Sequence, residues 1–177
     1  MTFFKKNNSK TSGFTLIETF VAITVLIISI VGPFTLVMKG LAVSKATKGQ
    51  ITAMYLAQEA IESVRNIRDE NILVGNNWLM DLEYCIGTGS SCMINAPVHR
   101  DVRSCSVGGC LPLEFHPGTK IYGYDLPVGS ADSILTRTVE IEEITDNIEV
   151  IITVTMKWDE GPRERDFVVS EHLMNWQ

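Results

Sequence analysis

The hydrophobic and polar positions of the chain follow three successive patterns. Residues 14–38 form a nearly continuous apolar run, and the twenty residues from Thr19 to Met38 include no charged side chain. Residues 50–72 then carry apolar side chains at helical spacing, and residues 134–172 contain stretches that alternate with the period of two typical of β-strands. This order predicts one long helix followed by a β-rich domain.

The apolar run is long enough to cross a membrane as a helix. About 20 helical residues, each rising 1.5 Å, span the roughly 30 Å hydrocarbon core of a bilayer. A buried core helix would show a polar stripe, and a secretory signal peptide would have a shorter apolar core with a small-residue cleavage site. Three lysines and no acidic residue precede the run, which favours a cytoplasmic N-terminus, although three lysines also follow it.

Two features inside the run are unusual for a membrane helix. Gly32 and Pro33 lie in its C-terminal half, and a proline removes one backbone hydrogen bond, so we expect a kink or local unwinding there. Glu18 places a carboxylate in an apolar segment, which costs roughly 2–3 kcal/mol or more and is a functional hypothesis by default. The alternative is that Glu18 only faces the positive end of its own helix dipole.

The string Gly13-Phe14-Thr15-Leu16-Ile17-Glu18, between a short lysine-bearing leader and the apolar run, resembles the type III signal sequence of bacterial type IV prepilins and type II secretion pseudopilins. The resemblance implies that a prepilin peptidase cleaves between Gly13 and Phe14 and methylates Phe14. It also implies that Glu18 pairs with the N-terminus of a neighbouring subunit during filament assembly.

The chemistry of these residues agrees with that expectation. The new α-amine of Phe14 would have an ordinary pKa of about 7.7–8 and would be largely cationic at neutral pH. A carboxylate attracts such a cation strongly in a low-dielectric environment. Because Glu18 is four residues from Phe14, it can reach its own terminus or that of a neighbour.

Residues 39–74 are predicted to continue the helix as an amphipathic segment. Met54, Ala57, Ile61 and Val64 are expected on one face, and Gly75 is the first strong helix breaker. Residues 56–65 also resemble the corresponding stretch of V-type minor pilins. Their charged side chains are equally consistent with a solvated helix face.

Residues 134–144 and 148–158 predict two strands of an antiparallel hairpin, joined by the turn residues 145–147. The apolar face of the first contains Leu135, Val139 and Ile141, together with Arg137. Residues 159–162 predict a second turn and 165–172 a third strand, so we expect a sheet of three or four strands. The stretch 75–133 has no strong periodicity.

The irregular stretch contains all four cysteines, Cys85, Cys92, Cys105 and Cys110. Outside the cytoplasm such residues form lasting disulfides, and four cysteines allow three pairings. We favour Cys85–Cys92 with Cys105–Cys110, because each pair closes a short loop. The alternatives are free thiols and a zinc site that also uses His99 or His116, but the spacings are not those of a tight zinc motif.

Composition and charge narrow the classes of function. The net charge is −6, and the chain without its first 13 residues would carry −9, which argues against direct binding of nucleic acid. The sequence contains no G-x-S-x-G, H-E-x-x-H or P-loop motif, so neither an enzyme nor a cofactor is expected. Trp78, Trp158 and Trp176 are expected in the core or at its rim.

The sequence therefore predicts an α+β, pilin-like fold, in which a long N-terminal helix packs on a small antiparallel β-sheet head. The expected divisions are a leader at 1–13, a transmembrane and assembly helix at 14–38, its amphipathic continuation at 39–74 and an extracytoplasmic head at 75–177.

The resemblance implies a structural, minor subunit of a type IV pilus or type II secretion pseudopilus. Such a subunit would have four partners: prepilin peptidase, other pilin or pseudopilin subunits, an inner-membrane assembly platform and the lipid bilayer. The alternative function is an uncleaved single-span anchor that displays an extracytoplasmic binding domain.

Overall fold

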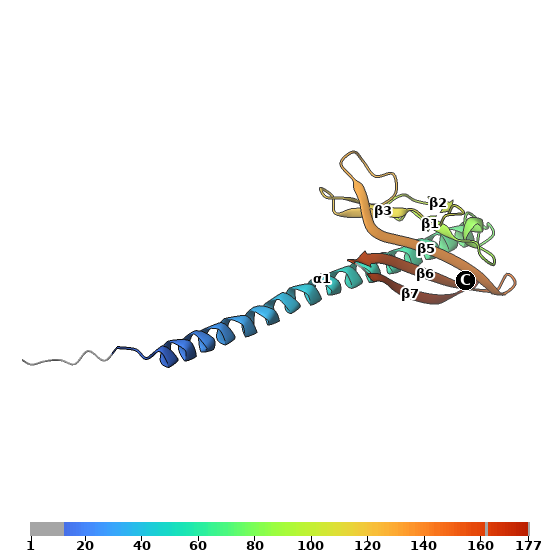
Figure 1. Cartoon of the computed structure of the whole chain (residues 1–177). Helices are drawn as coiled ribbons and strands as arrows, with labels where there is room; N and C mark the ends of the chain where they lie inside the picture. Colours follow the sequence, from blue (N-terminus) through green and yellow to red (C-terminus); the bar gives the residue numbers. More distant parts are fainter. Residues whose placement is uncertain (1–12, 162, 177) are drawn as a thin grey trace, which may run out of the picture. The chain divides into compact units, whose positions relative to one another are not determined.

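A computed structural model describes residues 13–161 and 163–176, and Figure 1 shows the order of its elements. The chain divides into two compact units between Lys45 and Ala46, each described by itself below. Helix α1 contributes to both units. The β-rich unit also contains a 3₁₀ turn and seven strands, which are η1 (Glu83–Cys85), β1 (Cys92–Ile94), β2 (Val102–Ser104), β3 (Pro112–His116), β4 (Ile121–Gly123), β5 (Ala131–Thr145), β6 (Glu149–Glu160) and β7 (Arg163–Met174).

Helix α1 extends over Leu16–Val74, close to the predicted range. It ends in a Schellman arrangement, in which the N–H of Gly75 donates to the carbonyl of Ile72 and the N–H of Asn76 donates to that of Asn71. Gly75 has a φ of 82°, in the left-handed region that glycine adopts at little cost. The breaker predicted from the sequence is therefore the residue that terminates the helix.

The part of α1 in the β-rich unit buries one continuous stripe. Its buried side chains recur every three or four residues and are Ala53, Leu56, Ala57, Ala60, Ile61, Val64, Ile67 and Asn71. The prediction for Met54 was wrong, since this side chain is exposed and Ala53 takes the interior position. Both assignments fit a helical period, but the stripe is centred about one residue earlier than expected.

The three C-terminal strands form the predicted antiparallel meander. Strand β5 pairs with β6 in a register that places Leu135 opposite Trp158 and Val139 opposite Val154. Strand β7 pairs with β6 along its whole length. The buried face of β5 is the one predicted, and it includes Arg137. The alternation of apolar and polar residues is sufficient to predict these strands because each of them buries only one face.

In the part of the chain that the structure describes, the sheet has seven strands, so the expectation of three or four was wrong. The four additional strands, β1 to β4, arise from the stretch without periodicity and contain only three to five residues each. Strands β1 and β3 both pair with β5, on the edge that β6 leaves free. Strands this short cannot display a clear alternation, which explains why the sequence pattern did not reveal them.

One hydrophobic core joins the helix stripe to the sheet. It includes Val64 from α1, Leu113 from β3, Val139 from β5 and Val154 from β6, all fully buried. Trp78 and Trp158 are buried in it, whereas Trp176 is 69% exposed. The fold is thus an α+β arrangement of a long helix packed on an antiparallel sheet.

Candidate functional site

The N-terminal end of α1 is built by a helix cap. The backbone N–H of Glu18 donates to the Oγ1 atom of Thr15 at 3.3 Å, which is the N-cap half of a capping box of the Thr-x-x-Glu type. Gly13 and Phe14 precede the helix and are exposed. The peptide bond between them is therefore in non-helical, accessible backbone. The rest of the predicted leader, residues 1–12, lies outside the described residues.

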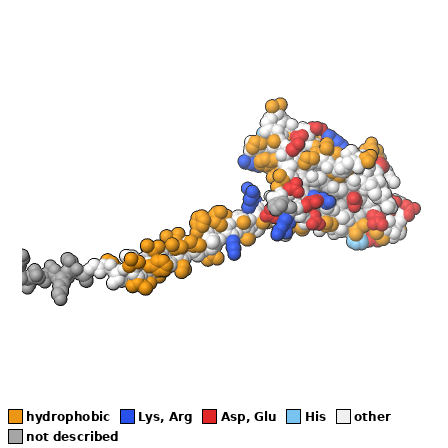
Figure 2. Space-filling model, in the orientation of Figure 1, with side chains coloured by type: hydrophobic (Ala, Val, Ile, Leu, Met, Phe, Trp, Pro, Cys, Tyr) orange, Lys and Arg blue, Asp and Glu red, His pale blue; other side chains and the backbone are white. Residues whose placement is uncertain are grey.

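The apolar run presents its side chains outward along the whole unit. The helix contains a window with a mean hydropathy of 2.5, none of it buried, and by length and composition it can cross a membrane. Figure 2 shows the hydrophobic side chains along this part of α1, followed by basic ones. A helix of this composition without a protein partner requires an apolar environment or other helices to cover it.

The few hydroxyl groups of the run are bonded to the helix itself. Thr24 Oγ1 donates to the carbonyl of Phe20 at 2.8 Å, and Ser29 Oγ donates to that of Leu26 at 2.8 Å. Thr19 makes an equivalent bond to Leu16. Since unsatisfied polar groups are expensive in hydrocarbon, these bonds make the hydroxyl groups compatible with an apolar environment.

The helix is unbroken at Gly32 and Pro33, so the local unwinding does not occur, whereas the alternative, a kink, stays a prediction. Pro33 has no N–H to offer to the carbonyl of Ser29, four residues earlier. One turn later Thr35 Oγ1 donates to the carbonyl of Gly32 at 2.8 Å. The proline thus weakens the hydrogen-bond ladder at one point without ending the helix.

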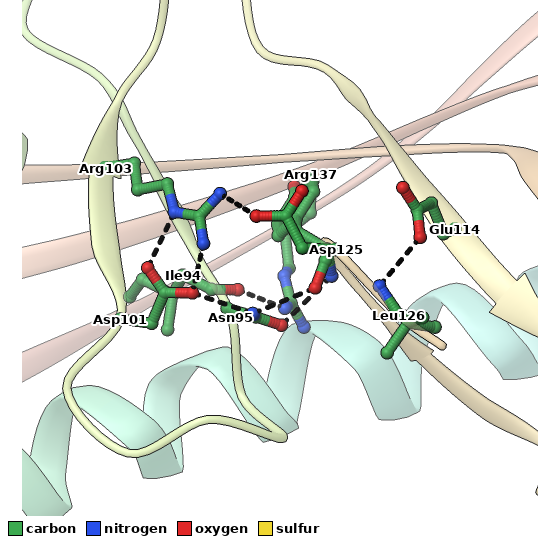
Figure 3. A network of polar contacts seen from close by, with 9 residues as sticks. Ile94, Asn95, Asp101, Arg103, Glu114, Asp125, Leu126 and Arg137 are labelled. Atoms are coloured by element: carbon green, nitrogen blue, oxygen red, sulfur yellow. Dashed lines mark hydrogen bonds and ion pairs between the residues drawn. The ribbon is translucent and has the colours of Figure 1, made fainter. Parts of the chain in front are cut away.

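The β-rich unit contains a network of polar contacts that includes Arg137, Ile94 and Asn95 (Figure 3). Arg137 of β5 is fully buried, and its Nη1 atom donates to the carbonyl of Leu56 at 2.9 Å and to Glu59 at 3.1 Å. Its Nη2 atom donates to the carbonyl of Ile94. The sequence pattern placed Arg137 on the buried face, but gave no indication of these acceptors.

A second part of the network is centred on Asn95. Its side-chain amide is hydrogen-bonded to both the N–H and the carbonyl of Tyr124, at 3.0 and 3.1 Å, and also donates to Asp101 at 2.8 Å. Two bonds from Arg103 hold the pKa of the Asp101 carboxyl below its usual value, although burial opposes this effect. Burial also raises the pKa of Tyr124. Sequence reasoning missed Asn95 and Asp101, because single polar residues in the loop between two short strands show no pattern.

The cysteines are paired as predicted, Cys85 with Cys92 and Cys105 with Cys110. The zinc and free-thiol alternatives are therefore wrong, since all four sulfur atoms are in disulfides. His99 instead contacts Glu70, with 2.8 Å between the Nε2 and Oε2 atoms. In the described part of the chain, no group of three or more potential ligands is placed to hold a metal ion.

No family model, curated protein or solved structure matches this chain. Function is accordingly inferred from the residues and their geometry. The features most informative about function are the accessible Gly13–Phe14 bond, the capped start of α1 with its carboxylate, and the uncovered apolar part of the helix.

Proposed function

We propose that the chain is a type IV pilin-like subunit of a pilus or secretion pseudopilus. The observation that carries this proposal is the single helix Leu16–Val74, which is apolar and uncovered in its first part and packed on a β-rich head in its last part. Such a helix can be stored in a membrane and then transferred into a bundle of similar helices. The Gly13–Phe14 bond lies immediately before it, where a membrane peptidase could reach it.

In this proposal the mature N-terminus and Glu18 work together. Cleavage creates an ammonium group at Phe14, and Glu18 supplies the one carboxylate of the apolar run. Burying either charge alone is costly, and pairing them in the bundle relieves that cost. The pair would align each entering subunit with its neighbour.

The first test is the intact mass of the protein recovered from its native membrane. The proposal expects loss of residues 1–13, gain of one methyl group and a deficit of four hydrogen atoms from the two disulfides. A full-length mass would contradict it and favour the uncleaved single-span anchor. A Gly13→Val variant should remain full-length, whereas a Ser12→Ala variant, altered one residue from the bond, should be processed.

The role of Glu18 requires a variant that separates charge from helix capping. Glutamine and glutamate both serve at the third position of a capping box, so Glu18→Gln preserves helix initiation and removes the charge. We expect this variant to be processed and inserted but absent from filaments. Filaments containing it at the wild-type level would assign Glu18 to capping alone.

A further inference from the structure

A group of carboxylates near the end of β5 has no counter-charge among the described residues. Among the described residues, no ion pair involves Glu140, Glu142, Glu143 or Asp146, although many other charged side chains of the head are paired. All four are exposed. Surface carboxylates this close together repel one another, so a cationic partner would stabilise them.

Two of these carboxylates line a cleft of about 190 Å³. Glu140 and Glu142 stand on the solvent face of β5, Thr153 of β6 lies beside them, and the loop Gly87–Ser90 forms the opposite wall. The Cys85–Cys92 disulfide closes that loop, and the N–H of Gly87 donates to the carbonyl of Ile141 at 3.2 Å. The cleft is thus a constrained site lined with carboxylate, hydroxyl and carbonyl oxygens.

Such a lining suits the ammonium group of a lysine side chain. An ammonium has three hydrogen atoms to donate and no acceptor, and the cleft offers oxygen acceptors on both walls. A volume of about 190 Å³ exceeds several times the roughly 30 Å³ that one water molecule occupies in the liquid, so the end of a lysine side chain fits.

The chain also carries unpaired lysines. Lys39, Lys45 and Lys48 are exposed on α1, and no ion pair involves them in the described part of the chain. The sequence contains no acidic residue between Glu18 and Glu59, so no carboxylate lies within one helical turn of these lysines. We call residues 39–48 the lysine segment.

Lys48 cannot reach the cleft of its own copy. Lys48 is adjacent to Gly49, which lies against Trp158, and Trp158 pairs with Leu135 on β5. Glu142 is seven residues further along β5, and at about 3.3 Å per residue this is about 23 Å, far beyond the reach of an ion pair. Lys48 can therefore meet Glu142 only in another copy.

We propose that the lysine segment of one copy binds the acidic cleft of a second copy. This inference rests on the proposed function, in which copies lie parallel in a filament. Parallel copies displaced along their helix axes would bring the segment of one beside the cleft of another. Because the two contacting surfaces differ, the contact is heterologous and can repeat without closing, as a filament requires.

The test uses the full chain in filaments assembled from a mixture of ¹⁵N-labelled and unlabelled copies. A water-soluble carbodiimide joins a carboxyl to a neighbouring amine as an amide and takes up the released water as a urea. We expect mixed-isotope peptides that link Glu140 or Glu142 to the lysine segment. The double variant Glu140→Gln/Glu142→Gln should lose them, and Asp132→Asn on the same strand should keep them.

A charge exchange provides the second test. Lys45→Glu/Lys48→Glu should lower the yield of sedimenting filaments several-fold, and adding Glu140→Lys/Glu142→Lys should restore it. Filaments that form equally well with either pair reversed would overturn this inference and leave the proposed function standing. Cross-links from the cleft only to a different protein would also overturn it, and a processed wild-type chain that never enters filaments would overturn both.

Discussion

The Nη1 atom of Arg137 donates a hydrogen bond to the backbone carbonyl of Leu56 at 2.9 Å, inside the interface between the sheet and α1. A helical carbonyl already accepts a bond from the residue four positions on, so Leu56 accepts two. The guanidinium thereby attaches β5 to the helix near the start of its packed part, which runs from Ala53 to Asn71. Its Nε atom has no partner in the described part of the chain.

Substitutions of Arg137 should separate packing from charge. Arg137→Ala leaves a cavity and should lower the free energy of unfolding by about 3–5 kcal/mol. Arg137→Met fills most of the volume and avoids burying a charge, and the partner Glu59 is 43% exposed and can be rehydrated, so we expect a loss of only about 1–2 kcal/mol. Urea unfolding of the full chain in detergent, monitored by tryptophan fluorescence, measures the stability of both variants. Equal decreases in the free energy of unfolding would contradict this account.

Substitutions of Gly123 and Asn95 should have coupled effects on the free energy of unfolding. A Cβ atom at position 123 would lie 2.9 Å from Asn95 Oδ1 and 3.0 Å from a methyl carbon of Leu126, so Gly123→Ala must displace the buried amide. We expect Gly123→Ala to lower the free energy of unfolding by about 1–3 kcal/mol. The decrease should be smaller when Asn95 is already alanine.

A double-mutant cycle with Asn95→Ala measures this coupling. Gly108→Ala is the control, because this glycine is outside helices and strands and a Cβ atom there meets only the Ser106 hydroxyl, at 3.8 Å. Strict additivity of Gly123→Ala and Asn95→Ala would show that the amide is not what obstructs the new methyl group.

Acidification should weaken the head through Asp101. Because Arg103 lowers the pKa of this carboxyl in the folded state, its stabilising contribution is complete above the unfolded pKa of about 3.9 and is lost as the pH falls through the folded pKa. Asp101→Asn should therefore be less stable than wild type at neutral pH and lose less stability below about pH 4. Unfolding curves across that interval measure the difference, and Asp132→Asn should keep the wild-type slope.

Removal of the two disulfides should lower the free energy of unfolding by different amounts. Cys85 and Cys92 are both fully buried, whereas Cys105 and Cys110 are only half-buried. Loop-closure entropy predicts a similar loss of about 2–2.5 kcal/mol for either short loop. The Cys85→Ala/Cys92→Ala variant should lose more than Cys105→Ala/Cys110→Ala because it also empties buried volume. Equal losses, measured by the same unfolding assay, would show that packing of the buried sulfur atoms contributes little.

The sequence predicted the parts of the fold that repeat a simple period over many residues. The long helix, its end at Gly75 and the buried faces of β5 and β6 follow from spacing alone. The short strands β1 to β4 do not, because their pairing depends on contacts distant in sequence. For the same reason the acceptors of Arg137 and the cleft beside Glu140 were not predictable, whereas the candidate residues at the start of α1 are contiguous and could be read directly.

The final prediction concerns Gly49, where helix propensity and packing act in opposite directions. Glycine in a helix interior costs roughly 1 kcal/mol relative to alanine. A Cβ atom at this position would meet the indole nitrogen of Trp158 at 3.4 Å, an ordinary contact distance, so Gly49→Ala should raise the free energy of unfolding by about 0.5–1 kcal/mol. Gly49→Leu would push into the indole and should lower it by about 1–3 kcal/mol. If leucine were tolerated as well as alanine, Trp158 would not be held against the helix as the structure shows.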